Sequence, residues 1–225
     1  MFDPPFRLSL EWNWEGDRNM RRNIGWFFGF ALILAAAMAP AHAHHAMDYA
    51  LPATALEGFL SGIGHPVIGV DHLIFIAGAG VLAAQFHRGF LLPLLFVVAS
   101  TLAAAARYSG ADMAMGELPV AGSLVVLATI LLVAQTPGAA VIGVLFFIAG
   151  TIHGYALAEA IVGAERTPLV AYLAGLAVIQ SAIALAAWRI ATWAAARHPK
   201  LPTRWLAGAA TGIAGLVFTA MALMG

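Results

Sequence analysis

The sequence predicts an all-α protein: a polytopic membrane helix bundle of about six transmembrane helices that follow a cleavable signal peptide. Hydrophobic residues make up 62% of the 225 residues and charged residues only 10%, against roughly 25% charged in an average soluble domain. The charges gather in short clusters between long apolar stretches. Those stretches approach the ~20 residues that a helix needs to cross ~30 Å of hydrocarbon.

Composition also excludes several classes of function. The chain has no cysteine, which rules out disulfides, thiolate metal sites and thiol catalysis. Its formal net charge is zero and Lys200 is its only lysine, so no basic surface for nucleic acid is expected. A retinal Schiff base would need a lysine within a span, and Lys200 lies between predicted helices.

Residues 20–43 have the three parts of a signal peptide. Two arginines follow Met20, an apolar run comes next, and the segment ends in Ala41-His42-Ala43. We expect cleavage after Ala43, with Ala41 as the other option. An uncleaved anchor helix is the alternative interpretation.

Residues 1–19 are polar, aromatic and acidic, unlike the start of a signal peptide. They are expected to be either the product of a mis-assigned start codon or an N-terminal extension. Cleavage would leave His44 and His45 at a new N-terminus, where they are candidate metal-capturing residues. Residues 44–225 then form one membrane domain.

Six apolar segments follow, separated by turn and breaker residues. They are Pro66–Gln85, Phe90–Ala106, Leu118–Ala134, Ala139–Ile161, Pro168–Trp188 and Trp205–Leu223. The stretch Ala53–Ile63 is too short to cross alone, and is expected to be an interfacial helix or the outer end of a long, kinked first helix.

Basic residues predict the orientation. With a cleaved signal peptide, the loops expected in the cytoplasm hold five basic residues: Arg88, Arg189, Arg197, Lys200 and Arg204. The loops expected in the periplasm hold two, Arg107 and Arg166. Because positive residues favour the cytoplasmic side, this asymmetry agrees with the signal peptide. We therefore expect a multi-pass protein of the bacterial inner membrane with both mature termini periplasmic.

Ionisable residues within the predicted spans carry the functional information, because a charge at mid-membrane costs about 2.5–3.5 kcal/mol on insertion scales. The first span holds His65, Asp71 and His72, and the fourth holds His153 and Glu159. All five fall in the periplasmic half of the predicted topology. Glu117 and Glu165, near the third and fourth spans, are weaker candidates for the same site.

Local geometry indicates how these groups could meet. Residues seven apart share one face of a helix but lie about 10 Å apart along it. Pro66 suits a first helical position, so His65 is expected on non-helical backbone, folded back toward His72. Glycines in the first and fourth spans are expected to bring those two spans together.

Imidazole and carboxylate ligands without thiolates suit a borderline divalent metal such as Ni²⁺, Co²⁺ or Zn²⁺. A proton relay uses the same residue types and stays an alternative. A structural interpretation is also open, in which each histidine is a hydrogen-bonding residue between helices and Asp71 and His72 form a buried ion pair.

The motifs resemble those of one known family. His65-x5-Asp71-His72 is similar to the His-x5-Asp-His signature of the HupE/UreJ family, nickel or cobalt permeases associated with hydrogenase and urease. The segment from His153 to Glu159 resembles that family's His-Gly motif in the fourth span. It departs from the motif at Leu157 and Ala158, where the family form has a His and then a Gly.

The resemblance implies a secondary transporter that moves a divalent metal ion, nickel first and cobalt next, and supplies metalloenzyme maturation. It implies that the ion is handled by His65, Asp71, His72, His153 and Glu159. No permanently bound cofactor and no enzymatic activity are expected. Partners are the transported ion and the lipid bilayer; a homo-oligomer or a metallochaperone partner stays open.

Two other classes fit parts of the pattern. An intramembrane zinc hydrolase would need about three protein ligands and an open fourth position, with Ser61 or Ser123 available as a nucleophile. An accessory membrane subunit without transport activity would need none of these groups to bind an ion.

Overall fold

The computed structural model describes residues 51–111 and 117–224, and every regular element in these segments is a helix. This confirms the predicted all-α membrane class. The elements are α2 (Ala55–Ile68), α3 (Val70–Ala83), η1 (Gly89–Leu91), α4 (Leu92–Tyr108), α5 (Glu117–Leu132), α6 (Ala139–Leu157), η2 (Ala158–Ala160), α7 (Arg166–Arg197) and α8 (Thr203–Met224). The predicted signal peptide, His44 and His45 lie outside the described residues.

Four segments of the described chain are long and apolar enough to cross a membrane: Gly89–Tyr108, Ala139–Ala160, α7 and α8. Helices α2 and α3 make a fifth candidate span if this bent pair is counted as one. Helix α5 is apolar but has only 16 residues. The structure thus supports four or five spans by length and composition, and six stays a prediction.

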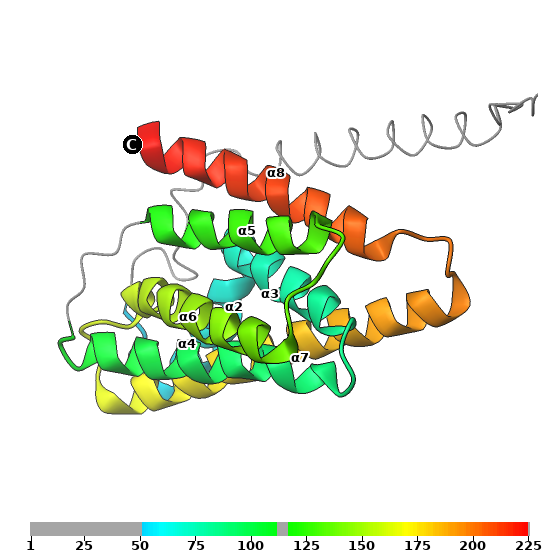
Figure 1. The fold of residues 1–225 in the computed structure, drawn as a ribbon. Coiled ribbons are helices and arrows are strands. Elements are labelled where there is room, and N and C mark those ends of the chain that lie inside the picture. The colour runs from blue at the N-terminus through cyan, green and yellow to red at the C-terminus, as the bar shows by residue number, and fades with distance from the viewer. Residues whose placement is uncertain (1–50, 112–116, 225) are drawn as a thin grey trace, which may run out of the picture. The chain divides into compact units, whose positions relative to one another are not determined.

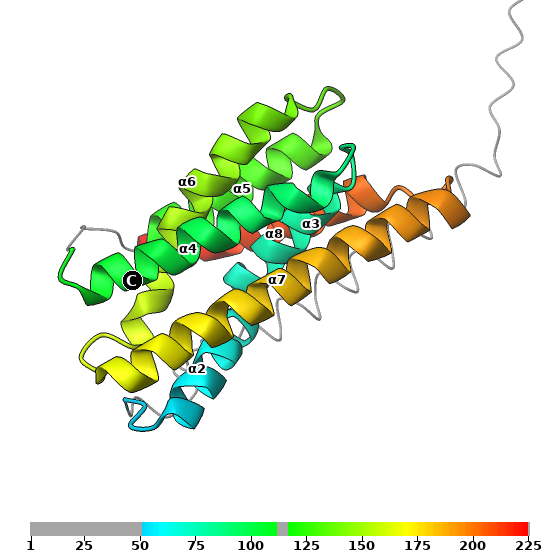
Figure 2. The ribbon, with the colours of Figure 1, turned by 90° about the horizontal axis from the view of Figure 1, so that it is seen from below.

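The helices pack mainly in pairs that are distant in sequence. Helix α4 lies along α6, α5 along α8, and α2 along the first half of α7, as Figures 1 and 2 show from two sides. Helix α3 sits among these pairs and contacts α5, α7 and α8. Its residues Phe75, Ile76, Ala79 and Leu82 are almost wholly buried in the main hydrophobic cluster. The residues just after the α2–α3 break are therefore held at the centre of the bundle.

Glycines allow the close pairs to form, but with different partners from those expected. A β-carbon at Gly62 of α2 would overlap the backbone of Tyr172 on α7. A β-carbon at Gly150 or Gly154 of α6 would overlap the backbone of α4. The expectation that glycines bring the first and fourth spans together was wrong: α3 and α6 meet through side chains instead.

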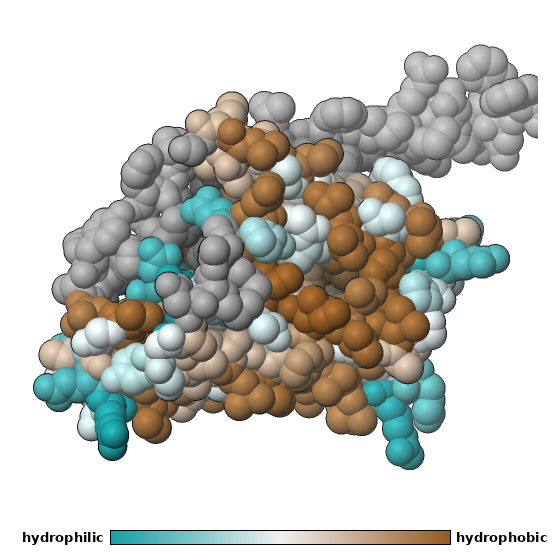
Figure 3. All heavy atoms as spheres, turned by 60° about the vertical axis from the view of Figure 1, so that its left-hand side comes forward, coloured by the Kyte–Doolittle hydropathy of each residue, from teal (hydrophilic) through white to brown (hydrophobic). Residues whose placement is uncertain are grey.

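The outer surface is apolar, as expected of a protein in lipid. Large hydrophobic side chains are exposed along several helices, among them Leu102, Val126, Val144, Val170 and Leu216. In Figure 3 hydrophobic residues form most of the visible face, and hydrophilic residues gather toward its edges. Removing such surface from water stabilises insertion at about 25 cal/mol per Å².

The local structure around Pro66 differs from the prediction. Helix α2 starts at a capping box, in which the Thr54 hydroxyl accepts from the Glu57 N–H and the Glu57 carboxylate accepts from the Thr54 N–H. A helix is therefore already running when the chain reaches Pro66, and His65 has helical backbone. An interior proline costs roughly 3 kcal/mol, because it removes one hydrogen bond and crowds the preceding turn. Packing of α2 on α7 offsets this, and the helix ends two residues later.

The break itself falls at Gly69, where α2 and α3 meet at 78°. The residues around Ala53–Ile63 are thus part of a strongly bent first helix pair. Helix α7 also departs from the prediction, since it continues nine residues past Trp188 to Arg197. The segment after Trp188 is rich in alanine, which favours helix, and the next proline is Pro199. The helix therefore continues beyond the apolar stretch.

Candidate functional site

The bend at Gly69 brings two of the predicted site residues together. His65 lies in the last turn of α2 and His72 in the first turn of α3. Their ring centroids are 6.3 Å apart, whereas seven residues of straight helix would separate them by about 10 Å. Both side chains are buried, with 5% and 6% of their surface exposed. The predicted proximity is confirmed, although a bend after His65 produces it rather than a non-helical His65.

The same bend points His72 at α6. The Nδ1 atoms of His72 and His153 are 2.7 Å apart, and the two ring centroids are 4.9 Å apart. His153 is fully buried. Since two nitrogens at this distance must share a proton, the rings form a hydrogen-bonded imidazole pair between α3 and α6.

Asp71 precedes this pair on α3. Its Oδ1 accepts a hydrogen bond of 2.9 Å from the backbone N–H of His72, and its side chain is half-buried. A carboxylate in the first turn of a helix is stabilised by the partial positive charge there. Asp71 therefore places a carboxylate beside His72 at the N-terminus of α3.

Two hydroxyl groups from other helices lie against the outer histidines, His153 and His65. Ser123 Oγ on α5 is 2.8 Å from His153 Nε2 and also donates to the Val120 carbonyl at 2.6 Å. Tyr172 on α7 donates its hydroxyl proton to the Leu157 carbonyl, and its oxygen is 3.4 Å from His65 Nδ1. Five helices, α2, α3, α5, α6 and α7, thus contribute to one histidine cluster, defined here as His65, His72 and His153.

Aromatic rings line the inner side of the cluster. The rings of Phe75 and Phe96 lie 4.6 Å and 5.3 Å from His153, measured between centroids. These apolar neighbours keep the medium around the imidazoles poor in water, which strengthens their hydrogen bonds.

The predicted carboxylates other than Asp71 lie on the surface. Glu159 is exposed on η2, Glu117 is exposed at the start of α5, and Glu165 is exposed as the residue before α7. Among the described residues, no group of three His, Asp or Glu side chains is arranged to enclose a metal ion. The structure therefore assembles the histidines and leaves the place of the glutamates in an ion pathway as a prediction.

A second buried polar pair was not anticipated. Gln180 on α7 donates from Nε2 to Ser100 Oγ on α4 at 3.1 Å, and both residues are fully buried. Within the described part of the chain, the Gln180 Oε1 atom meets no hydrogen-bond donor. A glutamine in the middle of the apolar run Pro168–Trp188 was the available signal. The sequence did not indicate a role for Tyr172 either, because tyrosines are common near membrane interfaces.

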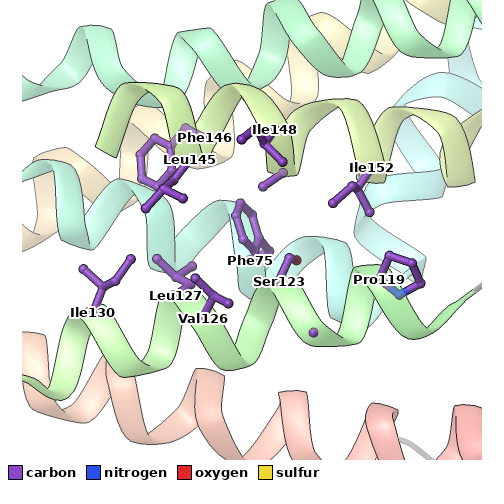
Figure 4. A pocket seen from close by; sticks show the side chains of 12 residues that line it. Phe75, Pro119, Ser123, Val126, Leu127, Ile130, Leu145, Phe146, Ile148 and Ile152 are labelled. Atoms are coloured by element: carbon purple, nitrogen blue, oxygen red, sulfur yellow. The ribbon is translucent and has the colours of Figure 1, made fainter. Parts of the chain in front are cut away.

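A cavity of about 270 Å³ lies beside the cluster, between α5 and α6. Phe75 lies within it, and its walls include Val126, Ile148 and Ile152, as Figure 4 shows. Ser123 contributes the hydroxyl group to an otherwise apolar lining.

The fold and site together define a class: a helical membrane protein with a bent helix pair and a buried histidine cluster. Residues 30–218 match the family model described as HupE / UreJ protein. The chain therefore belongs to the HupE/UreJ family, which places it among membrane metal transporters and accessory proteins. No curated protein and no solved structure matches the chain significantly.

Proposed function

We propose that the chain is a secondary permease that moves a divalent transition metal ion, Ni²⁺ first and Co²⁺ next, across the bacterial inner membrane. The observation that carries the proposal is the buried histidine cluster at the bend between α2 and α3, with Asp71 beside it. Imidazoles with a carboxylate and no thiolate match the ligand preference of these ions. The ion would serve metalloenzyme maturation, such as that of hydrogenase or urease.

The broken helix supports transport rather than storage. Broken helices in transporters place substrate and ion sites where the backbone is interrupted, and helix C-terminal carbonyls there face cations. Here α2 ends and α3 begins at Gly69, next to His65, Asp71 and His72. The terminal carbonyls of α2 carry partial negative charge, which favours a cation at this point.

Ion passage requires moderate binding, since an ion that is held by a closed set of ligands cannot leave. The histidines come from two different helix pairs, the bent pair α2–α3 and the pair α4–α6. A small relative movement of these pairs would open and close the approach to the cluster, so that an ion could enter and leave. His65 would meet the ion before His72, and Glu159 would act at the exposed mouth.

One contact bears on the zinc hydrolase alternative. Ser123 Oγ is 2.8 Å from His153 Nε2, a distance at which a histidine could act as the base for a serine nucleophile. However, a carbonyl oxygen cannot donate, so the 2.6 Å contact between Ser123 Oγ and the Val120 carbonyl must hold the hydroxyl proton. A serine activated for attack would direct that proton to the imidazole. The contact therefore favours transport.

The test is metal uptake by cells that express His65→Ala, Asp71→Asn, His72→Ala, His153→Ala or Glu159→Gln at matched membrane levels. Each variant is expected to lower high-affinity accumulation of ⁶³Ni²⁺ and ⁵⁷Co²⁺, with partial recovery at high external metal. The matched control is Glu57→Gln, which removes a half-buried charge outside the cluster while keeping an oxygen for the α2 capping box. Uptake at the wild-type level by all five variants would refute the pathway. Stoichiometric zinc that survives dialysis against a chelator would instead favour the enzyme.

A further inference from the structure

One end of the helix bundle, within the described part of the chain, carries basic residues and no acidic ones. Its connections and helix ends are residues 84–92, 133–138 and 189–204, which hold no Asp or Glu. Their five basic residues are Arg88, Arg189, Arg197, Lys200 and Arg204. Two contacts bring the three segments to the same end: Phe90 packs on Trp188, and Arg204 donates to carbonyls at the end of α5. A surface of one charge sign attracts a partner of the opposite sign.

Contacts within the protein account for one of these charges. The Arg204 guanidinium donates to the Ile130 and Val133 carbonyls at 2.8 and 2.6 Å, where the C-terminal end of α5 favours a cation. The side chains of Arg189, Arg197 and Lys200 are exposed instead. These three positive charges can therefore meet a partner outside the chain.

The end of α7 projects beyond the helices next to it. A β-carbon at Gly80 would lie 3.0 Å from the Trp188 nitrogen, so Trp188 lies near the end of α3 at Ala83. The apolar stretch of α7 ends at Trp188, whereas the helix continues for nine residues to Arg197, and Figure 2 shows this end extending past α3 and α4. Nine residues of helix span about 14 Å, and the headgroup layer is roughly 5–8 Å thick on each side of a bilayer. With the apolar stretch in hydrocarbon, the end of α7 therefore passes through the headgroup layer.

Basic and apolar side chains share one face of this projecting end. Because successive residues of a helix are about 100° apart, the positions 189, 190, 193 and 197 fall within an arc of about 100°. Ile190 and Trp193 are 64% and 49% exposed, so the face presents two large apolar groups together with two guanidinium groups. The His198 ring lies 5.5 Å from the Trp193 ring, which places the start of the α7–α8 connection beside this face. We define the α7-end surface as Arg189, Ile190, Trp193, Arg197 and Lys200.

From this arrangement we infer that the α7-end surface binds the headgroups of anionic phospholipids. Tryptophan prefers the boundary between hydrocarbon and headgroups, and arginine and lysine side chains reach from that boundary to phosphate groups. Basic residues directly after a membrane span increase the affinity for an anionic lipid surface about fivefold each. Lipid is favoured over an acidic protein because the surface continues directly from the apolar stretch of α7, whose side chains Val170 and Val178 are exposed. The inference does not depend on the proposed transport of a metal ion.

The test measures lipid preference with the full chain reconstituted in bilayers of phosphatidylcholine that contain a variable fraction of phosphatidylglycerol. One of the two lipids carries bromine atoms, which quench tryptophan fluorescence on contact. The part of the quenching that is lost in Trp193→Phe reports on the α7-end surface. We expect the wild type to favour phosphatidylglycerol at least about fivefold.

Three variants separate charge from structure. Arg189→Gln/Arg197→Gln/Lys200→Gln should lower the preference to about one, and so should about 1 M salt, which screens the charges. Arg189→Lys/Arg197→Lys keeps the charges and should keep the preference. The matched control is Arg166→Gln, which removes an exposed arginine from the other end of α7 and should leave the preference unchanged.

Several results would overturn the inference. Equal quenching by the two brominated lipids in the wild type would show that the surface has no lipid preference. A preference that survives the triple glutamine variant, or that Arg166→Gln abolishes equally, would place its origin elsewhere on the protein. Loss of the preference on addition of inorganic phosphate would show that the surface binds a free anion. Salt-sensitive binding of polyglutamate by a wild type without lipid preference would assign the surface to an acidic protein instead.

Discussion

A methyl group at Gly69 offers a sharp test of the bent helix pair. A β-carbon built there lies 2.8 Å from Cδ2 of His72 and 3.2 Å from the His65 carbonyl oxygen. The backbone at Gly69 can accept alanine, because its φ of −71° is allowed for any residue. Its backbone hydrogen bonds, from Gly69 N–H to the His65 carbonyl and from Leu73 N–H to the Gly69 carbonyl, do not involve a side chain. Gly69→Ala therefore acts on the position of the His72 ring.

The size of the effect follows from the contact distance. Carbon atoms settle about 3.5–4.0 Å apart, so the 2.8 Å contact must lengthen by about 0.7 Å. If the ring takes up the whole shift, its 2.7 Å contact with His153 reaches about 3.4 Å, beyond the usual hydrogen-bond range. Losing one such bond costs about 0.5–1.5 kcal/mol, or roughly two- to tenfold in an equilibrium constant.

The assay is the concentration dependence of initial ⁶³Ni²⁺ uptake at matched protein levels. Gly69→Ala is expected to raise the apparent KM by that two- to tenfold factor. The matched control is Gly122→Ala, where a β-carbon would have no neighbour within 4 Å. Equal KM values for Gly69→Ala, Gly122→Ala and the wild type, in a series where His72→Ala loses uptake, would show that the ring position next to Gly69 does not matter.

Two further predictions concern stability and topology. Ser100→Ala removes the hydroxyl that accepts from the buried Gln180 amide and should lower the free energy of unfolding by about 1 kcal/mol. Adding Gln180→Leu to this variant should recover most of the loss. Unfolding in detergent measures both changes, and strictly additive effects of the two substitutions would contradict the pairing. Because the chain has no cysteine, Glu165→Cys and His198→Cys can be compared cleanly with an impermeant maleimide. The predicted orientation requires labelling of the first and protection of the second in intact spheroplasts, and the reverse pattern would invert the topology.

The sequence by itself determined the class of the protein and the residues worth examining. Apolar runs of membrane-spanning length identify helices because transfer of such a run into hydrocarbon depends on composition, which is a local property. The rarity of ionisable groups in lipid singled out His65, His72 and His153 for the same reason. The end of the first apolar segment at Gln85, close to the observed end of α3 at Ala83, is equally local.

Only the tertiary structure decided how these groups meet. The sequence indicated a helix start at Pro66, but packing of α2 on α7 through Gly62 keeps the helix intact past it and moves the break to Gly69. Likewise, Ser123 and Tyr172 join the cluster because their helices are rotated to face it. Rotation and partner choice depend on contacts between helices that are distant in sequence, such as α5 with α8 and α4 with α6. In lipid, helices associate through close packing, and their lipid-facing and buried faces are both apolar. The spacing of hydrophobic residues, which identifies the buried face of a helix in a water-soluble protein, therefore does not predict these contacts.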